Sequence, residues 1–301
     1  MSAALVVGAD GLIGSALLRE LRGRGWTALG TTRRRHGPSD LLYLDLTDPL
    51  PDLSSRPGYG PLLALPDPAV FLAAASTGYV RCENDPEGSR RVNVTNSILL
   101  AKQWIGLGGF VVYPSSNAVF GDGAGGFAEY SARAPGSEYG RQKAAAEQAL
   151  LQLAAEAGRR GGVGVVRMTK VVHAGGLVAE WSSALKSGRP VDAAVDLRLS
   201  PVSLGHVVGG MIRVAGGRRT GIYHLSGERE LSYFEFAQRL AEALGQARSQ
   251  VREARVRGRI GKALSNSGAL MMTEASRLAG LEPQTVDSVL DALVKELSEA
   301  C

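Results

Sequence analysis

The sequence predicts an α/β protein whose parallel β-sheet is doubly wound, with helices on both faces. Three observations support this prediction. Short apolar runs recur along the first 170 residues, helical patterns of ten or more residues separate several of them, and a glycine-rich turn joins the first run to the first helix. Parallel strands buried on both faces read as continuous apolar runs and need helical crossovers, so this alternation indicates the doubly wound class.

Each expected element follows from its local pattern. In the first half the expected strands are 4–8, 27–32, 41–46, 69–75, 110–113 and 163–168, and the expected helices are 14–23, 86–104 and 138–157. The rhythm then changes to helices at 176–190, 205–217, 232–245 and 285–300, with a strand at 221–227. We therefore expect a main domain over 1–170 and a smaller α/β domain over 171–301, with segments at about 195–230 returning to the main domain.

The composition is that of a folded protein. Of the 301 residues, 45% are hydrophobic and 21% are charged, which excludes a disordered chain. The formal net charge is +5, but the arginines are scattered without an aromatic-plus-basic module, so an anionic small molecule explains the charge as well as nucleic acid does. The chain opens without a basic leader segment and holds no stretch of about 18 apolar residues. We expect a cytoplasmic protein that binds neither nucleic acid nor membrane.

Cysteine and histidine residues give no sign of a metal site. Cys82 and Cys301 have no ligand spacing and provide no basis for a disulfide framework. The four histidines are equally scattered, at positions 36, 173, 206 and 224. We therefore expect no bound metal.

Three glycines lie directly between the first strand and the first helix. Gly8 permits a tight turn, Gly11 lets the backbone approach a pyrophosphate, and Gly14 lets the helix pack close to the strand. A purely structural turn is the alternative interpretation. The position favours a Rossmann-type dinucleotide site, with Leu12 and Ile13 beside the cofactor.

The end of the second strand indicates which dinucleotide binds. An NAD-specific site carries an acidic residue there for the ribose 2′-hydroxyl, whereas this chain has Thr32, Arg33 and Arg34. A guanidinium pairs well with a 2′-phosphate, so the loop favours NADP(H), although a solvated basic loop is the alternative. Farther along, Asp45, Leu46 and the run Ala73, Ala74 and Ala75 are expected to form the close walls of the cofactor site.

Tyr139 and Lys143 stand four residues apart at the head of an alanine-rich helical run. With 8 Tyr and 6 Lys in 301 residues, chance places a lysine four after a tyrosine in about one chain of six, so the pair alone proves little. As chemistry, hydride transfer to a carbonyl needs a proton donor, a second hydrogen bond and a nearby cation. Lys143 would supply the cation and lower the pKa of Tyr139, and a serine after the fifth strand would supply the hydrogen bond.

The order of these motifs resembles a known family. The segments "GADGLIG", "AAAST", "VNVTN", "SSNAVFG" and "YGRQK" resemble those of the extended short-chain dehydrogenases/reductases in order and approximate spacing, over nearly the whole chain. The resemblance implies an NADP-binding Rossmann domain followed by a substrate-binding domain. It implies that Ser116 binds the carbonyl, Tyr139 donates the proton, and Lys143 tunes Tyr139 and holds the nicotinamide ribose. Asn93 matches a family asparagine that braces the catalytic region.

Missing residues narrow the reaction that the resemblance implies. Family dehydratases carry an Asp-Glu pair after the catalytic hydroxyl, where this chain has Asn117 and Ala118. Family enzymes that epimerise carbons beside a ketone use a cysteine near the serine, and none lies there. Simple carbonyl reduction, or C4 epimerisation with a retained cofactor, remains. The Arg33 signal favours an exchangeable NADPH and therefore reduction.

The second half of the chain is similar to the later part of the dTDP-4-dehydrorhamnose reductase group, which clamps a nucleotide-diphosphate sugar. We therefore expect substrate contacts from Asn117, Lys170, Arg198 and Arg257. Arg257 belongs to a basic run with Arg252, Arg255, Arg259 and Lys262 that either meets a diphosphate or forms a solvated face. The group typically has Thr-Asp where this chain has Ser116-Asn117, which leaves the identity of the sugar open.

Three functions follow from these observations. The first is an NADPH-dependent reductase of a nucleotide-linked 4-keto-6-deoxy sugar. The second is a nucleotide-sugar epimerase with a retained cofactor, and the third is a non-catalytic regulatory subunit that binds NADP or a sugar nucleotide. A homodimer is compatible with each of them.

Overall fold

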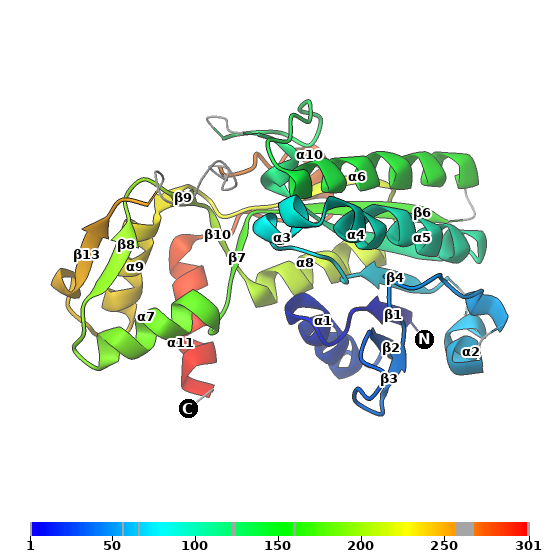
Figure 1. Cartoon of the computed structure of the whole chain (residues 1–301), viewed down its shortest axis with the longest axis horizontal. Helices are drawn as coiled ribbons and strands as arrows, with labels where there is room; N and C mark the ends of the chain where they lie inside the picture. Colours follow the sequence, from blue (N-terminus) through cyan, green and yellow to red (C-terminus); the bar gives the residue numbers. More distant parts are fainter. Residues whose placement is uncertain are drawn as a thin grey trace.

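The computed structural model describes residues 2–55, 57–65, 67–121, 125–158, 161–256 and 268–299. Within these ranges, seven parallel strands form one sheet in the order β11-β6-β5-β4-β1-β2-β3 (Figure 1). Their bounds are β1 Ala3–Val7, β2 Thr27–Thr32, β3 Leu41–Tyr43, β4 Ala69–Leu72, β5 Phe110–Ser116, β6 Gly162–Met168 and β11 Gly221–Leu225. The doubly wound parallel sheet predicted from the sequence is confirmed.

Two hydrophobic cores sandwich this sheet because each buried strand sends alternate side chains to opposite faces. On one face, α1 (Leu12–Gly23) and α8 (Leu204–Gly217) pack against the sheet through Leu17, Leu21, Val207 and Met211. On the other face lie α2 (Gly60–Leu63), α5 (Ser97–Gly106) and α6 (Glu138–Ala157), and residues such as Leu100, Trp104 and Leu150 fill the core. Figure 1 shows α5 and α6 on the side of the sheet opposite to α1 and α8.

A second body of elements lies to the left of the seven-stranded sheet in Figure 1. It contains α7 (Gly176–Lys186), β8 (Val191–Ala194), α9 (Tyr233–Ala243), β13 (Val251–Ala254) and α11 (Val286–Glu299), around a core that includes Trp181, Phe236 and Leu293. β8 and β13 pair in parallel. β11 returns to the main sheet beside β6, while the domain boundary near residue 170 stays a prediction.

Short elements link the two parts. β7 (Lys170–Val172) pairs in parallel with β10 (Pro201–Ser203), and β9 (Arg198–Leu199) pairs antiparallel with β12 (Leu231–Ser232). The remaining helices are α3 (Tyr79–Asn84), α4 (Pro86–Arg90) and α10 (Glu274–Leu278), with 3₁₀ turns at 53–55, 57–59, 117–119 and 248–250. None of the described helices has the length and apolar character needed to cross a membrane.

The helix expected at 86–104 is not one regular helix. α4 is followed by a π-helical turn at Arg91–Asn96 and then by α5. A π-helical turn is rare and often marks a functional site. Here it buries Asn93, which is 1% exposed, against Gln142 of α6.

Candidate active site

The carboxyl ends of the central strands open onto two adjoining cavities. The first, the glycine-turn cavity, has a volume of about 260 Å³ and is lined by Gly8, Asp10, Gly11, Arg33, Arg34, Leu44, Asp45, Leu46, Thr47, Ala73, Ala74, Ala75, Ser76, Arg81 and Val92. The second, the tyrosine cavity, has a volume of about 370 Å³ and contains Ser116, Tyr139 and Lys143. Ala73 and Ala75 line both cavities, so the two spaces meet at the end of β4.

The glycine turn is shaped by close backbone approaches. Gly8 has a φ of +81°, and a Cβ on it would lie 2.8 Å from the Cα of Ala74. A Cβ on Gly14 would lie 2.1 Å from the carbonyl oxygen of Gly8. Only glycine fits both positions, which brings the start of α1 directly over the end of β1.

The start of α1 is open to an anion. Its N-cap residue is Gly11, and no side chain of the described residues caps the first-turn N–H groups. Uncapped N–H groups at a helix start favour a phosphate. Of the two residues expected beside the cofactor here, Ile13 lines the tyrosine cavity, whereas Leu12 is 43% exposed and lines neither cavity.

Asp10, which is not among the predicted site residues, holds the loop of Arg33 and Arg34 through Thr32 and Arg34. Asp10 Oδ2 accepts a hydrogen bond from Thr32 Oγ1 at 2.8 Å and lies 3.2 Å from Arg34 Nε. Thr32 is buried and does not line the glycine-turn cavity, so its hydroxyl braces the loop. Arg33 and Arg34 do line the cavity. Asp10 lies inside the glycine motif, and its partners become visible only when β1 and β2 pair.

These residues fit a dinucleotide phosphate. The cavity has a glycine cradle that any Cβ on Gly8 would fill, uncapped N–H groups at the start of α1, and two arginines at its rim. Its other walls are the small side chains of Ala73, Ala74 and Ala75, with Asp45 and Leu46 opposite. Asp45 Oδ1 accepts hydrogen bonds from both the backbone and the hydroxyl of Thr47, each at 2.8 Å, which fixes that wall.

Ser116, Tyr139 and Lys143 converge on the tyrosine cavity from two elements. Ser116 ends β5, and its Oγ accepts a hydrogen bond from the backbone N–H of Ala118 at 3.1 Å. Tyr139 and Lys143 project from α6, where they are 8% and 3% exposed. Lys143 Nζ donates to the Pro114 carbonyl at 2.8 Å and lies 5.8 Å from the centre of the Tyr139 ring. Asn117 and Lys170 line the same cavity.

Burial controls both ionisations. It raises the pKa of Tyr139 above its usual value, and the neighbouring Tyr79 and Cys82 raise it further. The net shift is therefore upward, and not the fall that the neighbouring Lys143 was expected to produce, because desolvation of the phenolate dominates. Burial also lowers the pKa of Lys143 to about 8. A tyrosine that keeps its proton suits a reaction in which it donates one.

The turn that carries Ser116 packs tightly on the start of α6. A Cβ on Gly140 would lie 2.2 Å from the carbonyl oxygen of Ala118. Ser137 caps α6 by accepting a hydrogen bond from the Gly140 N–H at 3.1 Å. Gly140, beside Tyr139, therefore sets the spacing between the turn that carries Ser116 and α6.

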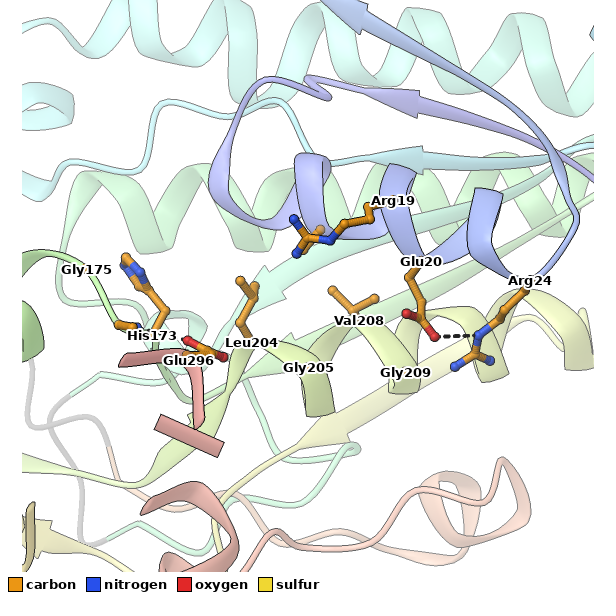
Figure 2. Close-up of a pocket in the computed structure, with 12 residues that line it drawn as sticks. Arg19, Glu20, Arg24, His173, Gly175, Leu204, Gly205, Val208, Gly209 and Glu296 are labelled. Atoms are coloured by element: carbon orange, nitrogen blue, oxygen red, sulfur yellow. Dashed lines mark hydrogen bonds and ion pairs between the residues drawn. The ribbon is translucent and has the colours of Figure 1, made fainter. Parts of the chain in front are cut away.

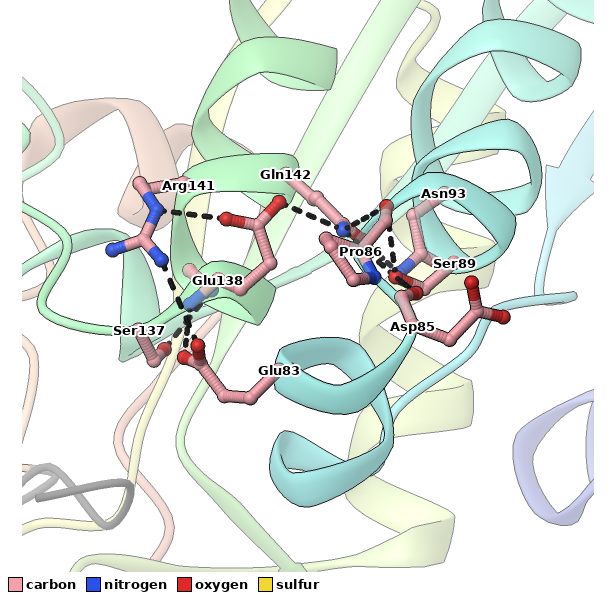
Figure 3. Close-up of polar contacts among 10 residues, drawn as sticks. Glu83, Asp85, Pro86, Ser89, Asn93, Ser137, Glu138, Arg141 and Gln142 are labelled. Carbon is pink, nitrogen blue, oxygen red and sulfur yellow. Dashed lines mark hydrogen bonds and ion pairs between the residues drawn. The ribbon is translucent and has the colours of Figure 1, made fainter.

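Behind this site lies a buried polar network between the π-helical turn and α6 (Figure 3). Asn93 Nδ2 donates to Gln142 Oε1 at 2.8 Å and to the Ser76 carbonyl at 2.9 Å, and Asn93 Oδ1 accepts from the Ser76 N–H at 2.7 Å. Ser76 lines the glycine-turn cavity and Gln142 lies one residue before Lys143. Asn93 therefore links the walls of both cavities.

The tyrosine cavity continues toward the second body of elements. A further cavity of about 240 Å³, the Trp181 cavity, shares Lys170, Val171 and Tyr233 with it.

Arg198 lines neither of these two cavities and pairs with Glu230 at 3.1 Å. Arg252 pairs with Asp192 at 2.9 Å, while Arg257, Arg259 and Lys262 lie outside the described residues. Tyr79, Thr169 and Tyr233 also line the tyrosine cavity but carried no recognisable local signal, and Thr77, at the end of the "AAAST" segment, lines it as well.

Another cavity, of about 600 Å³, lies between α1, α8 and the end of α11 (Figure 2). Arg19 and Glu20 face it from α1, Gly205 and Gly209 from α8, and Glu296 from α11, where Glu296 Oε2 accepts a hydrogen bond from the Ala174 N–H at 3.0 Å. None of the predicted site residues lines this cavity. The described residues contain no group of three or more His, Cys, Asp or Glu side chains placed to hold a metal ion.

The glycine turn, the parallel sheet and the convergence of serine, tyrosine and lysine on one strand end place the protein in the extended short-chain dehydrogenase/reductase class. The chain belongs to the family described as RmlD substrate binding domain, whose model matches residues 2–299.

Individual relatives agree with this assignment. The dTDP-4-dehydrorhamnose reductase of Mycolicibacterium smegmatis is 27% identical over 286 residues, which cover 93% of this chain and 80% of the relative. The methionine adenosyltransferase 2 subunit beta of Xenopus tropicalis is 32% identical over 148 residues, 49% of this chain and 42% of the relative. A crystal structure of dTDP-4-dehydrorhamnose reductase from Bacillus anthracis in complex with NADP superposes with a TM-score of 0.81 at 20% identity, covering 98% of this chain and 99% of the other.

Proposed function

We propose that the protein reduces a nucleotide-diphosphate-linked 4-keto-6-deoxy sugar with NADPH. The observation that carries the proposal is the junction at Ala73 and Ala75, where the cavity of the glycine turn opens into the cavity of Ser116, Tyr139 and Lys143. A dinucleotide in the first cavity would extend its reactive end into the second. The family and its named reductases support a sugar-nucleotide substrate.

The residues of the tyrosine cavity have distinct roles in this reaction. NADPH, when bound, supplies a hydride to the carbonyl carbon. Tyr139 gives its phenolic proton to the carbonyl oxygen, so the C=O group becomes an alcohol. Ser116 Oγ accepts a hydrogen bond from the Ala118 N–H, and its hydroxyl donates to Asn117 Oδ1 at 3.3 Å. With substrate bound, the same hydroxyl would donate a hydrogen bond to the carbonyl oxygen.

Lys143 supports the donor. Its ammonium lies beneath the Tyr139 ring and is anchored by the Pro114 carbonyl, so it favours the phenolate that forms when the proton leaves. As in the family that the chain resembles, we assign to it the nicotinamide ribose hydroxyls as well. Gly8, Gly11 and the start of α1 would hold the pyrophosphate, and Arg33 would meet the 2′-phosphate of NADPH.

On the substrate side, Lys170 is the strongest of the predicted contacts. It lines both the tyrosine cavity and the Trp181 cavity, so its ammonium stands where an anionic group of a sugar nucleotide would pass between them. Asn117 lines the tyrosine cavity close to Ser116. Arg198 forms an ion pair with Glu230, and this ion pair would have to break before Arg198 could contact a substrate.

A regulatory subunit is the second candidate, and one observation favours it. About half of the chain matches the methionine adenosyltransferase 2 subunit beta at 32% identity, which is higher than the identity to the reductase. The shared presence of Ser116, Tyr139 and Lys143 in one cavity favours catalysis.

One spectroscopic assay separates the candidates. NADPH oxidation is followed at its near-ultraviolet band with a panel of thymidine-, uridine- and guanosine-diphosphate-linked 4-keto-6-deoxy sugars. The proposal predicts stoichiometric loss of NADPH with at least one of them. A changed sugar without net loss of cofactor would indicate an epimerase, and tight NADPH binding without turnover on the whole panel would indicate the regulatory role.

A further inference from the structure

A buried carboxylate continues the catalytic face of α6. Tyr139, Lys143 and Glu147 follow one another at intervals of four residues, so their side chains share one face of the helix. The Glu147 side chain is completely buried. A buried charge on this face has to be compensated by its neighbours.

Glu147 receives hydrogen bonds from three side chains. Its Oε1 accepts from Ser115 Oγ at 2.5 Å and from Arg167 Nε at 3.0 Å. Its Oε2 accepts from Arg167 Nη2 at 2.7 Å and from Arg133 Nε at 2.8 Å. Both oxygens are thus engaged, and α6 is bonded through this one residue to β5 and β6.

Ser115 and Arg167 are register partners on these two strands. In the parallel pair β5–β6, Ser115 lies opposite Arg167, and Ser116 lies opposite Met168. Successive side chains of a strand point to opposite faces, so the bond from Ser115 to Glu147 on one face leaves Ser116 directed to the other. Holding Ser115 therefore holds the backbone that orients Ser116.

Arg167 is itself immobilised, which fixes the carboxylate that it pairs with. It is 1% exposed, and its Nη1 donates to the Glu129 carbonyl at 3.1 Å and lies 3.5 Å from His224 Nε2. Its guanidinium lies 4.8 Å from the centre of the Phe120 ring. The carboxylate of Glu147 consequently has one position relative to the helix.

The other neighbour affected is Lys143. Nζ lies 4.4 Å from the centre of the Tyr113 ring and 5.8 Å from that of Tyr139, and Glu147 shares its face of α6. Glu147 and Cys82 act on Lys143 electrostatically, and the guanidiniums of Arg133 and Arg167 offset part of the Glu147 charge. Burial lowers the pKa of Lys143 to about 8, and the charge of Glu147 opposes that fall more strongly than Cys82 does. Among these neighbours of Lys143, Glu147 is a carboxylate held in ion pairs, so it is the group that favours the charged form of Lys143.

From this geometry we infer that Glu147 is a positioning residue, which orients Ser116 through Ser115 and keeps Lys143 protonated at neutral pH. The catalytic consequence rests on the proposed reductase function. The effect on Lys143 does not, because it follows from burial and charge alone.

The decisive measurement is the titration of Lys143 itself. Protein labelled with ¹³C at lysine Cε is titrated by NMR, and the signal of Lys143 is assigned among the six lysines with the Lys143→Arg variant. In Glu147→Gln, which preserves size and hydrogen-bond acceptance, we expect the midpoint to fall by about 1 pH unit or more. In Glu147→Asp, which preserves charge, we expect it within about 0.5 unit of the wild type. An unmoved midpoint in the first variant overturns the inference.

Folding controls accompany the titration. Arg133→Gln removes one partner of Glu147 but leaves its carboxylate. The unfolding temperature should therefore fall, whereas the midpoint of the Lys143 titration should not move to lower pH. If Glu147→Gln fails to fold, Glu147→Asp decides instead. A fall of a full unit in that charge-preserving variant would rule out the charge role.

A kinetic measurement tests the effect on the reaction. In Glu147→Gln, the alkaline limb of kcat/KM for NADPH-dependent reduction should move to lower pH, which a loss of stability alone would not cause. Ser115→Ala should lower kcat about tenfold without moving that limb, and an unchanged kcat would remove the Ser116 part of the inference. If the NMR midpoint shifts as expected but no sugar is reduced by the wild type, the proposed function fails and the role of Glu147 toward Lys143 stands.

Discussion

Asn93 Nδ2 lies 2.8 Å from Gln142 Oε1, and this bond ties the π-helical turn to the helix that carries Tyr139 and Lys143. Gln142 is completely buried and also donates from Nε2 to Ser89 Oγ at 2.9 Å. Its amide thus joins α4, the π-helical turn and α6.

Replacing Gln142 by alanine should therefore destabilise the protein. The change leaves the buried amide of Asn93 with an unsatisfied donor, so we expect a loss of about 1–3 kcal/mol in the free energy of unfolding measured with urea. The matched control is Gln152→Ala on the same helix, whose exposed amide donates to Glu156, and it should change stability by less than about 0.5 kcal/mol. Equal effects of the two variants would contradict the role given to the network.

Gly140→Ala should separate α6 from the serine loop. The added Cβ meets the Ala118 carbonyl at 2.2 Å, and backbone at that distance has to move. Misplacing a catalytic group by about 1 Å costs up to about 100-fold in rate, so kcat should fall strongly in a stopped-flow assay. Gly209→Ala is the control: it is also helical, and apart from its own helix backbone no atom of the described residues lies within 4 Å of the added Cβ. It should stabilise the protein by about 0.5–1 kcal/mol. A Gly140→Ala enzyme with wild-type kcat would refute the spacing role.

Arg33→Asp should erode the preference for NADPH over NADH. Arg33 lines the glycine-turn cavity, and a carboxylate there would repel a 2′-phosphate and accept a hydrogen bond from a 2′-hydroxyl. The dissociation constant for NADH divided by that for NADPH, both measured by nucleotide fluorescence, should fall by about tenfold or more. Arg35→Asp makes the same change of charge at a residue that lies over the Tyr43 ring outside the cavity, so it should alter the ratio far less.

Lys143 should make stability depend on pH in a predictable direction. Its pKa is lowered from 10.5 in the free side chain to about 8 in the folded protein, so between these values the unfolded chain binds more protons than the native one. The contribution of Lys143 to the free energy of unfolding should therefore increase as the pH rises from about 8 to about 10. The increase is at most about 1.4 kcal/mol per pH unit. Urea titrations of the wild type and Lys143→Met should diverge over that window. Parallel curves would show that Lys143 is not titrating there.

Tyr139→Phe should abolish turnover and leave NADPH binding intact. The ring that packs edge-to-face on Tyr79 at 5.3 Å is retained, and only the proton donor is lost. General acid catalysis contributes about 10²–10⁴-fold, and kcat should fall accordingly in the NADPH oxidation assay. Tyr130→Phe removes a hydroxyl from a residue that is 82% exposed and should have no effect. Activity above a few per cent in Tyr139→Phe would rule out the proposed mechanism.

Much of this architecture was predictable because its signals are local. The buried strands are continuous apolar runs, and parallel strands end at one edge of the sheet, so Ser116 and the glycine turn had to meet there. Four-residue spacing placed Tyr139 and Lys143 on one helical face. Their roles, like those of the cofactor residues, stay predictions.

What the sequence did not reveal depends on contacts between distant segments. Asp10 acquires its partners when β1 and β2 pair, and Arg198 is taken up by Glu230, which lies 32 residues away. The pKa of Tyr139 was predicted in the wrong direction because charge proximity can be read from spacing, whereas the depth of burial cannot. Gly140 looked like any other helical residue until the Ala118 carbonyl was placed against it.

The π-helical turn at Arg91–Asn96 also limits how this part of the chain can change in length. A π turn contains one residue more than an α turn. Deleting a single residue there would restore regular α-helical hydrogen bonds and keep α4 and α5 close to their present orientation, because the π turn already absorbs the extra residue. The deletion would instead remove the widened turn from which Asn93 reaches Gln142, so the buried hydrogen bonds of Asn93 would be lost. Insertions and deletions should therefore be tolerated in the surface loops but not in this segment, although none of its residues lines the tyrosine cavity.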